Sequence, residues 1–290
     1  MPGRRITPDP EWSAYLDRLP PYRVARALRA QAPLLAFITW EVAKPPELGF
    51  IEHIIVDEAQ DVTPLEWFLL DAINEAHAWT LLGDLNQRRS DHTLSSWRQI
   101  REVLGLPEED TPIRKLRRGY RSTKPILEYA NRLLPRNQRA LLAFQEAGPE
   151  PCVGRVRAGD LGTAVVGQVD RLLGAYPDGT VAVISADPAT ARKSLRSAGW
   201  AMARTNPQIW ERNSRNVTVI DPDAVRGIEF DAVIVVEPAD FPQNYGRQGP
   251  LYTSLTRPNR ELAIVHAKPL PDALRRRPSR PMVAAASSAF

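Results

Sequence analysis

The chain contains 290 residues, 43% of them hydrophobic and 25% charged, which excludes a wholly disordered or fibrous protein and leaves room for about two domains. Its formal net charge of +4 only weakly indicates polyanion binding, and its single cysteine, Cys152, excludes a disulfide framework and favours a reducing compartment. No apolar run approaches the roughly 18 residues of a membrane span, and no secretory signal begins the chain, so we expect a cytoplasmic protein without a membrane partner.

The first half of the chain predicts a strand–helix–strand unit. Residues 51–56 are apolar and mostly β-branched, as is typical of a strand buried on both faces of a parallel sheet. A helical pattern follows over 64–76, and 78–84 predicts a second buried strand. Further along, 97–104 is helical and leads to a connector at 106–112, where we place a domain boundary.

The second half repeats this alternation, after a helix predicted over 124–134. Buried strands are predicted at 181–186, 217–221, 231–238 and 262–267, and helices at 161–175, 188–198 and 247–257. The sequence therefore predicts an α/β fold with parallel sheets. The expected organisation is an N-terminal helical or irregular segment at 1–32, a partial domain at 33–110, a more complete domain at 113–268 and a disordered basic tail at 269–290.

The most informative segment is VDEAQD, residues 56–61. It places Asp57 and Glu58 at the carboxyl end of a buried strand, where open α/β sheets bind ligands. Asp57 could hold Mg²⁺, and Glu58 could deprotonate a water molecule that attacks a phosphoryl group. The alternative is that these carboxylates cap the following helix.

Further candidates lie close to other predicted strands. Gln87 follows the strand ending in Gly-Asp and could sense a phosphate, although Gly-Asp is also a common turn. Arg121 precedes a predicted helix and could bind a γ-phosphate as a bidentate donor. Arg257 follows a threonine just before the last strand. In DAVRGIEFD, Arg226 and a glycine precede Glu229 and a buried strand. For each arginine the alternative is an ordinary solvated surface position.

In this order the segments VDEAQD, GDLNQ, GYRS, RGIEFD and LYTSLTR resemble motifs II, III, IV, V and VI of the UvrD/Rep-like superfamily 1 helicases. The sequences GDLNQ and YRSTKPILEYAN are most similar to those of the HelD-type branch, whose members act on RNA polymerase. The resemblance covers about residues 50–268. It implies P-loop NTPase, RecA-like domains, of which the first is incomplete here.

The resemblance also implies ATP and Mg²⁺ as cofactors. Asp57 would be the Mg²⁺ ligand and Glu58 the general base, while Gln87 would place the attacking water or the γ-phosphate. Arg121 and Arg257 would be the two arginine sensors of the second domain. Glu229 would contact the ribose.

Two further residues are candidates for contact with single-stranded nucleic acid. The resemblance implies that this nucleic acid is DNA. Trp97 is the nearest aromatic residue after motif III, where the family stacks a base, although packing within the protein is the alternative role for this side chain. Arg226 stands at the motif V position of a lysine in the family. Asp221 and Asp223 stand where the family has Thr and His, which weakens the case for tight binding at that motif.

The sequence departs from the family because it has no phosphate-binding Gly-Lys-Ser/Thr loop. None of its five lysines follows a glycine: they are Lys44, Lys115, Lys124, Lys193 and Lys268. Without the strand that carries this loop, the strand at 51–56 is expected to keep an unpaired edge. The chain could be part of a split or truncated motor, could dock on a protein that supplies the loop, or could have a rearranged half-domain.

Two functions therefore remain open. One is an ATP-dependent superfamily 1 helicase or translocase module whose Walker A loop comes from elsewhere. The other is a catalytically inactive, helicase-like binding module for nucleic acid, RNA polymerase or another protein.

Overall fold

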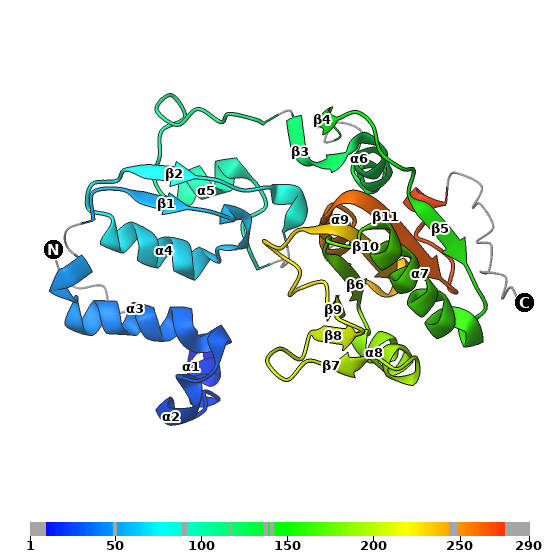
Figure 1. Cartoon of the computed structure of the whole chain (residues 1–290). Helices are drawn as coiled ribbons and strands as arrows, with labels where there is room; N and C mark the ends of the chain where they lie inside the picture. The colour runs from blue at the N-terminus through cyan, green and yellow to red at the C-terminus, as the bar shows by residue number, and fades with distance from the viewer. Residues whose placement is uncertain are drawn as a thin grey trace, which may run out of the picture. The chain divides into compact units, whose positions relative to one another are not determined.

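The computed structural model describes residues 10–48, 51–88, 92–116, 118–135, 139, 142–243 and 249–275. The chain divides into two compact units (Figure 1). The first comprises the described residues within Met1–Gly83 and His92–Pro112, and the second those within Asp84–Asp91 and Ile113–Phe290. Both contain parallel strands, which confirms the predicted α/β class. In the described part of the chain, no helix is long and apolar enough to span a membrane.

The first unit is built around a β–α–β element. Its elements are α1 (Pro10–Asp17), α2 (Tyr22–Ala25), α3 (Ala32–Ala43), β1 (Ile54–Val56), α4 (Pro64–Ile73), β2 (Trp79–Leu81) and α5 (Trp97–Val103). Strand β1 pairs in parallel with β2, as the sequence predicts. Trp67 of α4 and Ile100 of α5 are fully buried in the core of this unit. Helix α3 contacts α4 through an edge-to-face pair, Phe37 and Phe68, with ring centroids 5.6 Å apart.

The prediction that the first strand is buried on both faces is wrong. Val56 is buried, but the side chain of Ile55 is 67% exposed. Within the described residues β1 pairs with β2 alone, and the sheet has two strands. Because the side chains of a strand alternate between faces, a two-stranded sheet covered on one face exposes every second residue.

The second unit contains a seven-stranded sheet. Its elements are β3 (Arg118–Thr123), α6 (Lys124–Ala130), β4 (Leu142–Gln145), β5 (Cys152–Arg155), α7 (Leu161–Ala175), β6 (Val181–Ser185), α8 (Pro188–Ser197), β7 (Ala201–Met202), β8 (Ile209–Arg212), β9 (Arg215–Ile220), β10 (Phe230–Val236), α9 (Gly249–Leu255) and β11 (Pro258–His266). The strand order is β5-β11-β10-β6-β9-β8-β7, in which the first five strands are mutually parallel and β8 runs antiparallel to both of its neighbours, β9 and β7. Strands β3 and β4 form a separate parallel pair.

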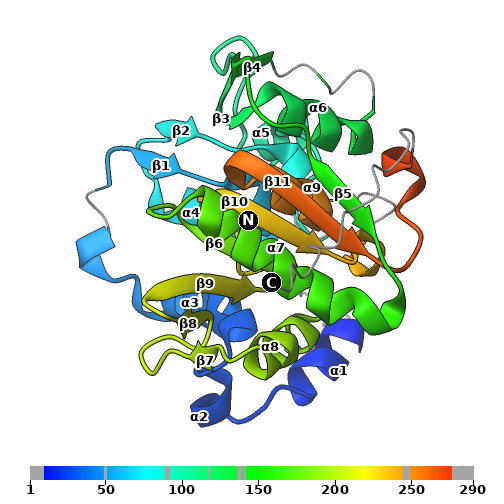
Figure 2. The same ribbon diagram turned by 45° about the vertical axis from the view of Figure 1, so that its right-hand side comes forward.

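Helices cover both faces of this sheet (Figure 2). Helices α7 and α8 bury their apolar residues against one face, and α6 and α9 pack on the other. The central strand β6 is therefore buried at every position. Uninterrupted apolar strands between two helical layers are typical of parallel α/β folds and explain why the four strands were recognisable in the sequence.

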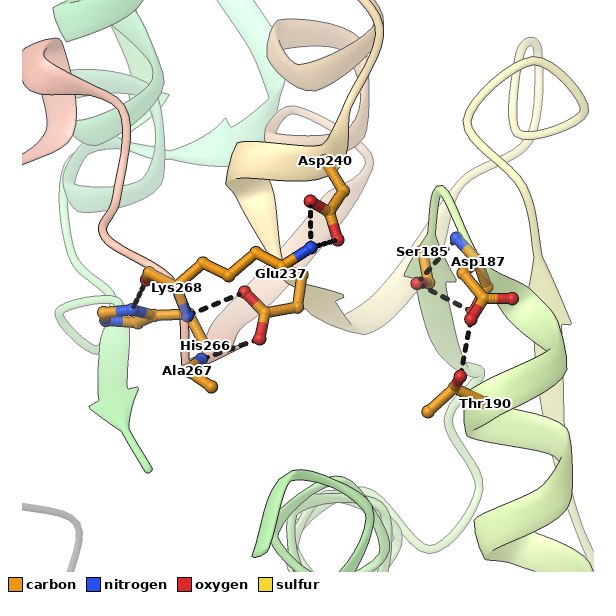
Figure 3. A network of polar contacts seen from close by, with 8 residues as sticks. All are labelled: Ser185, Asp187, Thr190, Glu237, Asp240, His266, Ala267 and Lys268. Carbon is orange, nitrogen blue, oxygen red and sulfur yellow. Dashed lines mark hydrogen bonds and ion pairs between the residues drawn. The ribbon is translucent and has the colours of Figure 1, made fainter. Parts of the chain in front are cut away.

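A polar network connects the chain segments that follow β10 and β11 (Figure 3). Glu237 adopts a left-handed conformation, with φ 48°. Its buried carboxylate accepts hydrogen bonds from the backbone N–H groups of Ala267, at 2.8 Å, and Lys268, at 3.2 Å. Lys268 in turn donates to Asp240 at 2.7 Å, which raises the pKa of the lysine. The network thus fixes the ends of two central strands.

Replacing Glu237 with Ala is expected to lower the free energy of unfolding by about 2 kcal/mol, because two backbone donors lose a charged acceptor. Urea denaturation followed by circular dichroism measures this loss. Glu211→Ala, at an exposed position of β8, is the matched control and should change the free energy by less than about 0.5 kcal/mol. Equal effects of the two substitutions would show that the Glu237 hydrogen bonds do not stabilise the unit.

Candidate functional site

In the first unit, the turn after β1 presents the two predicted carboxylates. Leu82 donates to the carbonyl of Val56 and accepts from the N–H of Ala59, both at 2.8 Å, which fixes both ends of the turn. Asp57 is exposed and accepts from the N–H of Glu58 at 2.8 Å. Glu58 is left-handed, with φ 53° and ψ 41°. Left-handed non-glycine residues cost of order 1 kcal/mol and are frequent at functional sites.

The alternative role of these carboxylates as helix caps is wrong. Helix α4 is capped by Thr63, whose side chain accepts from the N–H of Glu66 while Glu66 accepts from the N–H of Thr63 at 2.7 Å. Asp57 and Glu58 lie ahead of this capping box and take no part in it. Their placement at the strand end therefore needs another explanation.

Gln60 holds the Glu58 carboxylate in place, a role that the sequence analysis missed. Its side chain is fully buried, and Nε2 donates to Glu58 Oε2 at 2.6 Å. Gly83 makes room for it, since a Cβ at Gly83 would lie 2.4 Å from Gln60 Oε1 and 3.1 Å from Ala59 N. The carboxylate of Glu58 is thus positioned by a buried amide that depends on a glycine of the next strand end.

Replacing Gly83 with Ala is expected to cost about 1–3 kcal/mol, because the added methyl displaces Gln60 or the backbone at Ala59. Gly167→Ala is the matched control: it lies on the exposed side of α7 with no atom within 4 Å of a Cβ, and should stabilise the chain by about 0.5–1 kcal/mol. Thermal unfolding of both variants measures these changes in stability. A Gly83→Ala protein as stable as the parent would contradict the close approach of Gly83 to Gln60 and Ala59.

In the second unit, three predicted residues from distant segments meet. Gln87 ends a short 3-10 helix, Leu85–Gln87, that Asp84 caps by accepting from Asn86 N–H at 2.9 Å. Arg257 Nη2 donates to Gln87 Oε1 at 3.0 Å, and Arg226 Nη2 donates to Gln87 O at 2.6 Å. The structure therefore brings Gln87, Arg226 and Arg257 together.

Arg257 is 1% exposed, which is rare for an arginine. Its Nε donates to the carbonyl of Thr253 at 3.2 Å, so α9 and Gln87 both bind the guanidinium. The 3-10 helix packs closely on α9, because a Cβ on Gly249 would lie 2.6 Å from the carbonyl oxygen of Arg88. The pKa of the neighbouring Tyr252 is raised, mainly because its hydroxyl is buried and to a lesser extent because Asp84 is negatively charged.

Arg121 and Glu229 form an ion pair within the second unit, which the sequence analysis did not predict. The resemblance assigns them separate contacts, to a phosphate and to a ribose. Both side chains are partly exposed. Exposed pairs contribute at most about 1 kcal/mol, so a phosphate can replace Glu229 as the partner of Arg121 at little cost.

Trp97, the candidate stacking residue, is partly buried at the start of α5. It packs against the core cluster that contains Trp67 and Ile100, which favours the packing role over the stacking role.

Asp57 suits a magnesium ion that takes most of its ligands from phosphates and water, because it is an exposed carboxylate. Among the described residues there is no group of three or more His, Cys, Asp or Glu that could form a metal site by itself.

No protein-family model matches the chain. Over 102 residues it is 34% identical to the ATP-dependent DNA helicase srs2 of Schizosaccharomyces pombe, a match that takes 33% of this chain and 11% of that protein. The chain thus spans about a tenth of this curated relative.

Solved structures match less closely. The C-terminal domain of a possible DNA helicase from Lactobacillus plantarum WCFS1 is 25% identical, with a TM-score of 0.42 over 55% of this chain and 93% of that one. The arterivirus helicase, nonstructural protein 10, in complex with DNA is 18% identical, with a TM-score of 0.36 over 73% of this chain and 39% of that one. It is the 34% identity over 102 residues that makes part of the chain similar to a DNA helicase.

Proposed function

We propose that this chain is a module of an ATP-dependent superfamily 1 DNA helicase or translocase, of RecA-like fold, that carries motifs II to VI. Its Walker A loop would come from residues outside these 290. The similarity to a DNA helicase over 102 residues supports this class, and the five ordered motifs support the UvrD-like assignment.

The observation that carries the proposal is the meeting of Gln87, Arg226 and Arg257. They belong to motifs III, V and VI, and are separated by up to 170 residues in the chain, yet Gln87 accepts a hydrogen bond from each arginine. A buried arginine needs hydrogen-bond acceptors around it, and it is costly to keep without them. A phosphate-sensing role would give the contact between Gln87 and Arg257 a purpose, and Arg226, the candidate for contact with nucleic acid, would hold the backbone of Gln87.

The residues would act on the nucleotide in distinct ways. Asp57 would bind Mg²⁺, which would neutralise charge on the phosphates. Glu58, oriented by Gln60, would accept the proton of the attacking water. Gln87 would orient this water or the γ-phosphate, while Arg121 and Arg257 would stabilise the charge that develops on it and Glu229 would contact the ribose.

A catalytically inactive binding module, for single-stranded nucleic acid, RNA polymerase or another protein, is the second candidate. It is favoured by the lack of a Gly-Lys pair in the sequence and by the burial of Arg257. In such a module the ion pair of Arg121 with Glu229 would serve only the stability of the second unit.

Calorimetric titration of the purified chain with Mg²⁺·ATP at about 1 mM separates the two. The motor module should show weak, saturable binding that Arg121→Ala abolishes. Arg204→Ala, at an exposed position after β7, is the control and should leave the binding unchanged. Absence of binding, or binding that survives Arg121→Ala, would overturn the phosphate-sensing role and favour the inactive module.

A further inference from the structure

Positive charge is concentrated in one segment of the second unit, residues 188–216, which forms α8, β7, β8 and the start of β9. The segment contains six lysines and arginines and one acidic residue, Glu211, so its net charge of +5 exceeds the +4 of the whole chain. Helix α8 lies beside β7 and β8 in both views of the fold (Figures 1 and 2). The charge is therefore gathered at one edge of the seven-stranded sheet, where β8 and β7 are the last strands.

Two of these cations have a structural role. Arg212 Nη1 donates to the carbonyl of Ala198, just after α8, at 3.0 Å, and Nη2 forms an ion pair with Asp170 of α7. Arg192 is partly buried and donates to the carbonyl of Val219 at 3.3 Å. The packing of α7 and α8 on the sheet therefore accounts for these two arginines.

Three others, Lys193, Arg196 and Arg215, have no such role. Lys193 and Arg215 are exposed and make no hydrogen bond or ion pair within the part of the chain that the structure describes. Arg196 is exposed too, and its guanidinium carbon lies 5.6 Å from the centroid of the buried Trp210 ring. Among the described residues no group accepts a hydrogen bond from its side chain, so all three cations can take an anionic partner.

These three side chains lie on the same side of the sheet. Lys193 and Arg196 are three residues apart on α8 and are therefore neighbours on its surface. Arg215 is paired with Arg212 in the register of β8 and β9, and directly paired residues share a face. Because Arg212 reaches the carbonyl of Ala198 at the end of α8, Arg215 also lies on the α8 side.

The turn between β8 and β9 fixes the position of Arg215. Its two residues, Asn213 and Ser214, have φ angles of 51° and 61°. Positive φ at both central residues is the mark of a type I′ turn, which matches the twist of the strands that it joins. Arg215 is therefore presented by a short, regular hairpin.

No exposed aromatic ring accompanies the three cations. Trp200 and Trp210, the two aromatic residues of the segment, are 3% and 1% exposed. Single strands are bound by cations together with rings on which the bases stack, whereas a duplex keeps its bases paired and presents its phosphates. A surface of cations without rings therefore suits the phosphate backbone of a double strand.

We propose that Lys193, Arg196 and Arg215 bind the phosphate backbone of double-stranded DNA without reading its sequence. The inference rests on the proposed function for the choice of DNA among polyanions. It adds a duplex-binding surface to the second unit, and none of its residues is among those that would act on ATP.

Fluorescence anisotropy with a labelled, blunt-ended DNA duplex of about 20 base pairs, at about 50 mM salt, tests this surface. Lys193→Gln/Arg196→Gln/Arg215→Gln should bind at least about tenfold more weakly. It should also reduce the slope of log affinity against log salt by about 2.7, the value for three phosphate contacts to a duplex. The matched control, Arg18→Gln/Arg23→Gln/Arg26→Gln, removes the same charge from exposed positions of the first unit and should keep the parental slope.

Two further variants separate lost contacts from lost folding. Lys193→Gln/Arg215→Gln leaves Arg196 on the Trp210 ring and should reduce the slope by about 1.8. Arg196→Lys/Arg215→Lys keeps both charges and should retain the parental slope.

Three results would overturn the inference. The first is an equal loss in the two triple variants, which would make net charge, and not this surface, the cause of binding. The second is no binding of the duplex by the parent. The third is tighter binding of dT₂₀ than of the duplex by the parent, with the loss in the triple variant confined to dT₂₀. The proposed function is judged separately, because ATP binding by the parent and its loss in Arg121→Ala do not depend on the duplex.

Discussion

Replacing Glu58 with Gln is expected to lower Mg²⁺-dependent ATP hydrolysis by at least about 100-fold, which is the usual contribution of a general base. The amide matches the carboxylate in size but cannot accept a proton from water. Gln60 can rotate its amide to keep a hydrogen bond to the new side chain, so the turn after β1 should persist. The loss should thus be one of chemistry and leave folding unchanged.

Phosphate release measures this effect in the chain co-expressed with a candidate partner protein that carries a Gly-Lys-Ser/Thr loop, with single-stranded DNA present. Glu75→Gln, at an exposed position after α4, is the matched control and should hydrolyse ATP as the parent does. A Glu58→Gln protein within a few-fold of the parent would assign the base to another residue.

Replacing Arg257 with Ala is expected to lower the free energy of unfolding of the second unit by about 2–4 kcal/mol. The substitution leaves a cavity beneath α9 and removes the donors to Thr253 O and Gln87 Oε1. Urea denaturation of Arg257→Ala, Gln87→Ala and the double variant measures the coupling between the two side chains. A coupling near zero would show that the Gln87 contact contributes nothing to the burial of Arg257.

Arg204→Ala serves again as the control, since Arg204 is exposed and should change the free energy by less than about 0.5 kcal/mol. A loss in Arg257→Ala no larger than in this control would contradict the tight packing of Arg257.

In the second unit, the strands that the sequence revealed are those covered by helices on both faces. Residues 181–184 and 232–236 are continuous apolar runs because β6 and β10 occupy the centre of the sheet. Strands β5, β7 and β8 were missed because they lie toward the sheet edges, and the two residues of β7 are exposed. Strand β3 was missed because its sequence, RGYRST, is basic and polar, and β4, LAFQ, because the strand contains only three apolar residues.

The same contrast holds for the candidate site. The positions of Asp57 and Glu58 at a strand end followed from the abrupt change from apolar residues to carboxylates. The role of Gln60 did not, since a buried amide in a short turn has no sequence pattern. The pairing of Arg121 with Glu229 spans 108 residues, and only the folded chain brings them together.

The most direct test of the central claim is phosphate release from ATP by two samples, the chain alone and the chain co-expressed with a candidate partner protein that carries a Gly-Lys-Ser/Thr loop. The account predicts Mg²⁺-dependent hydrolysis, stimulated by single-stranded DNA, in the co-expressed sample and little in the chain alone. If ATP hydrolysis in both samples is no faster than in buffer without protein, this result would contradict the account, and the chain would be a binding module.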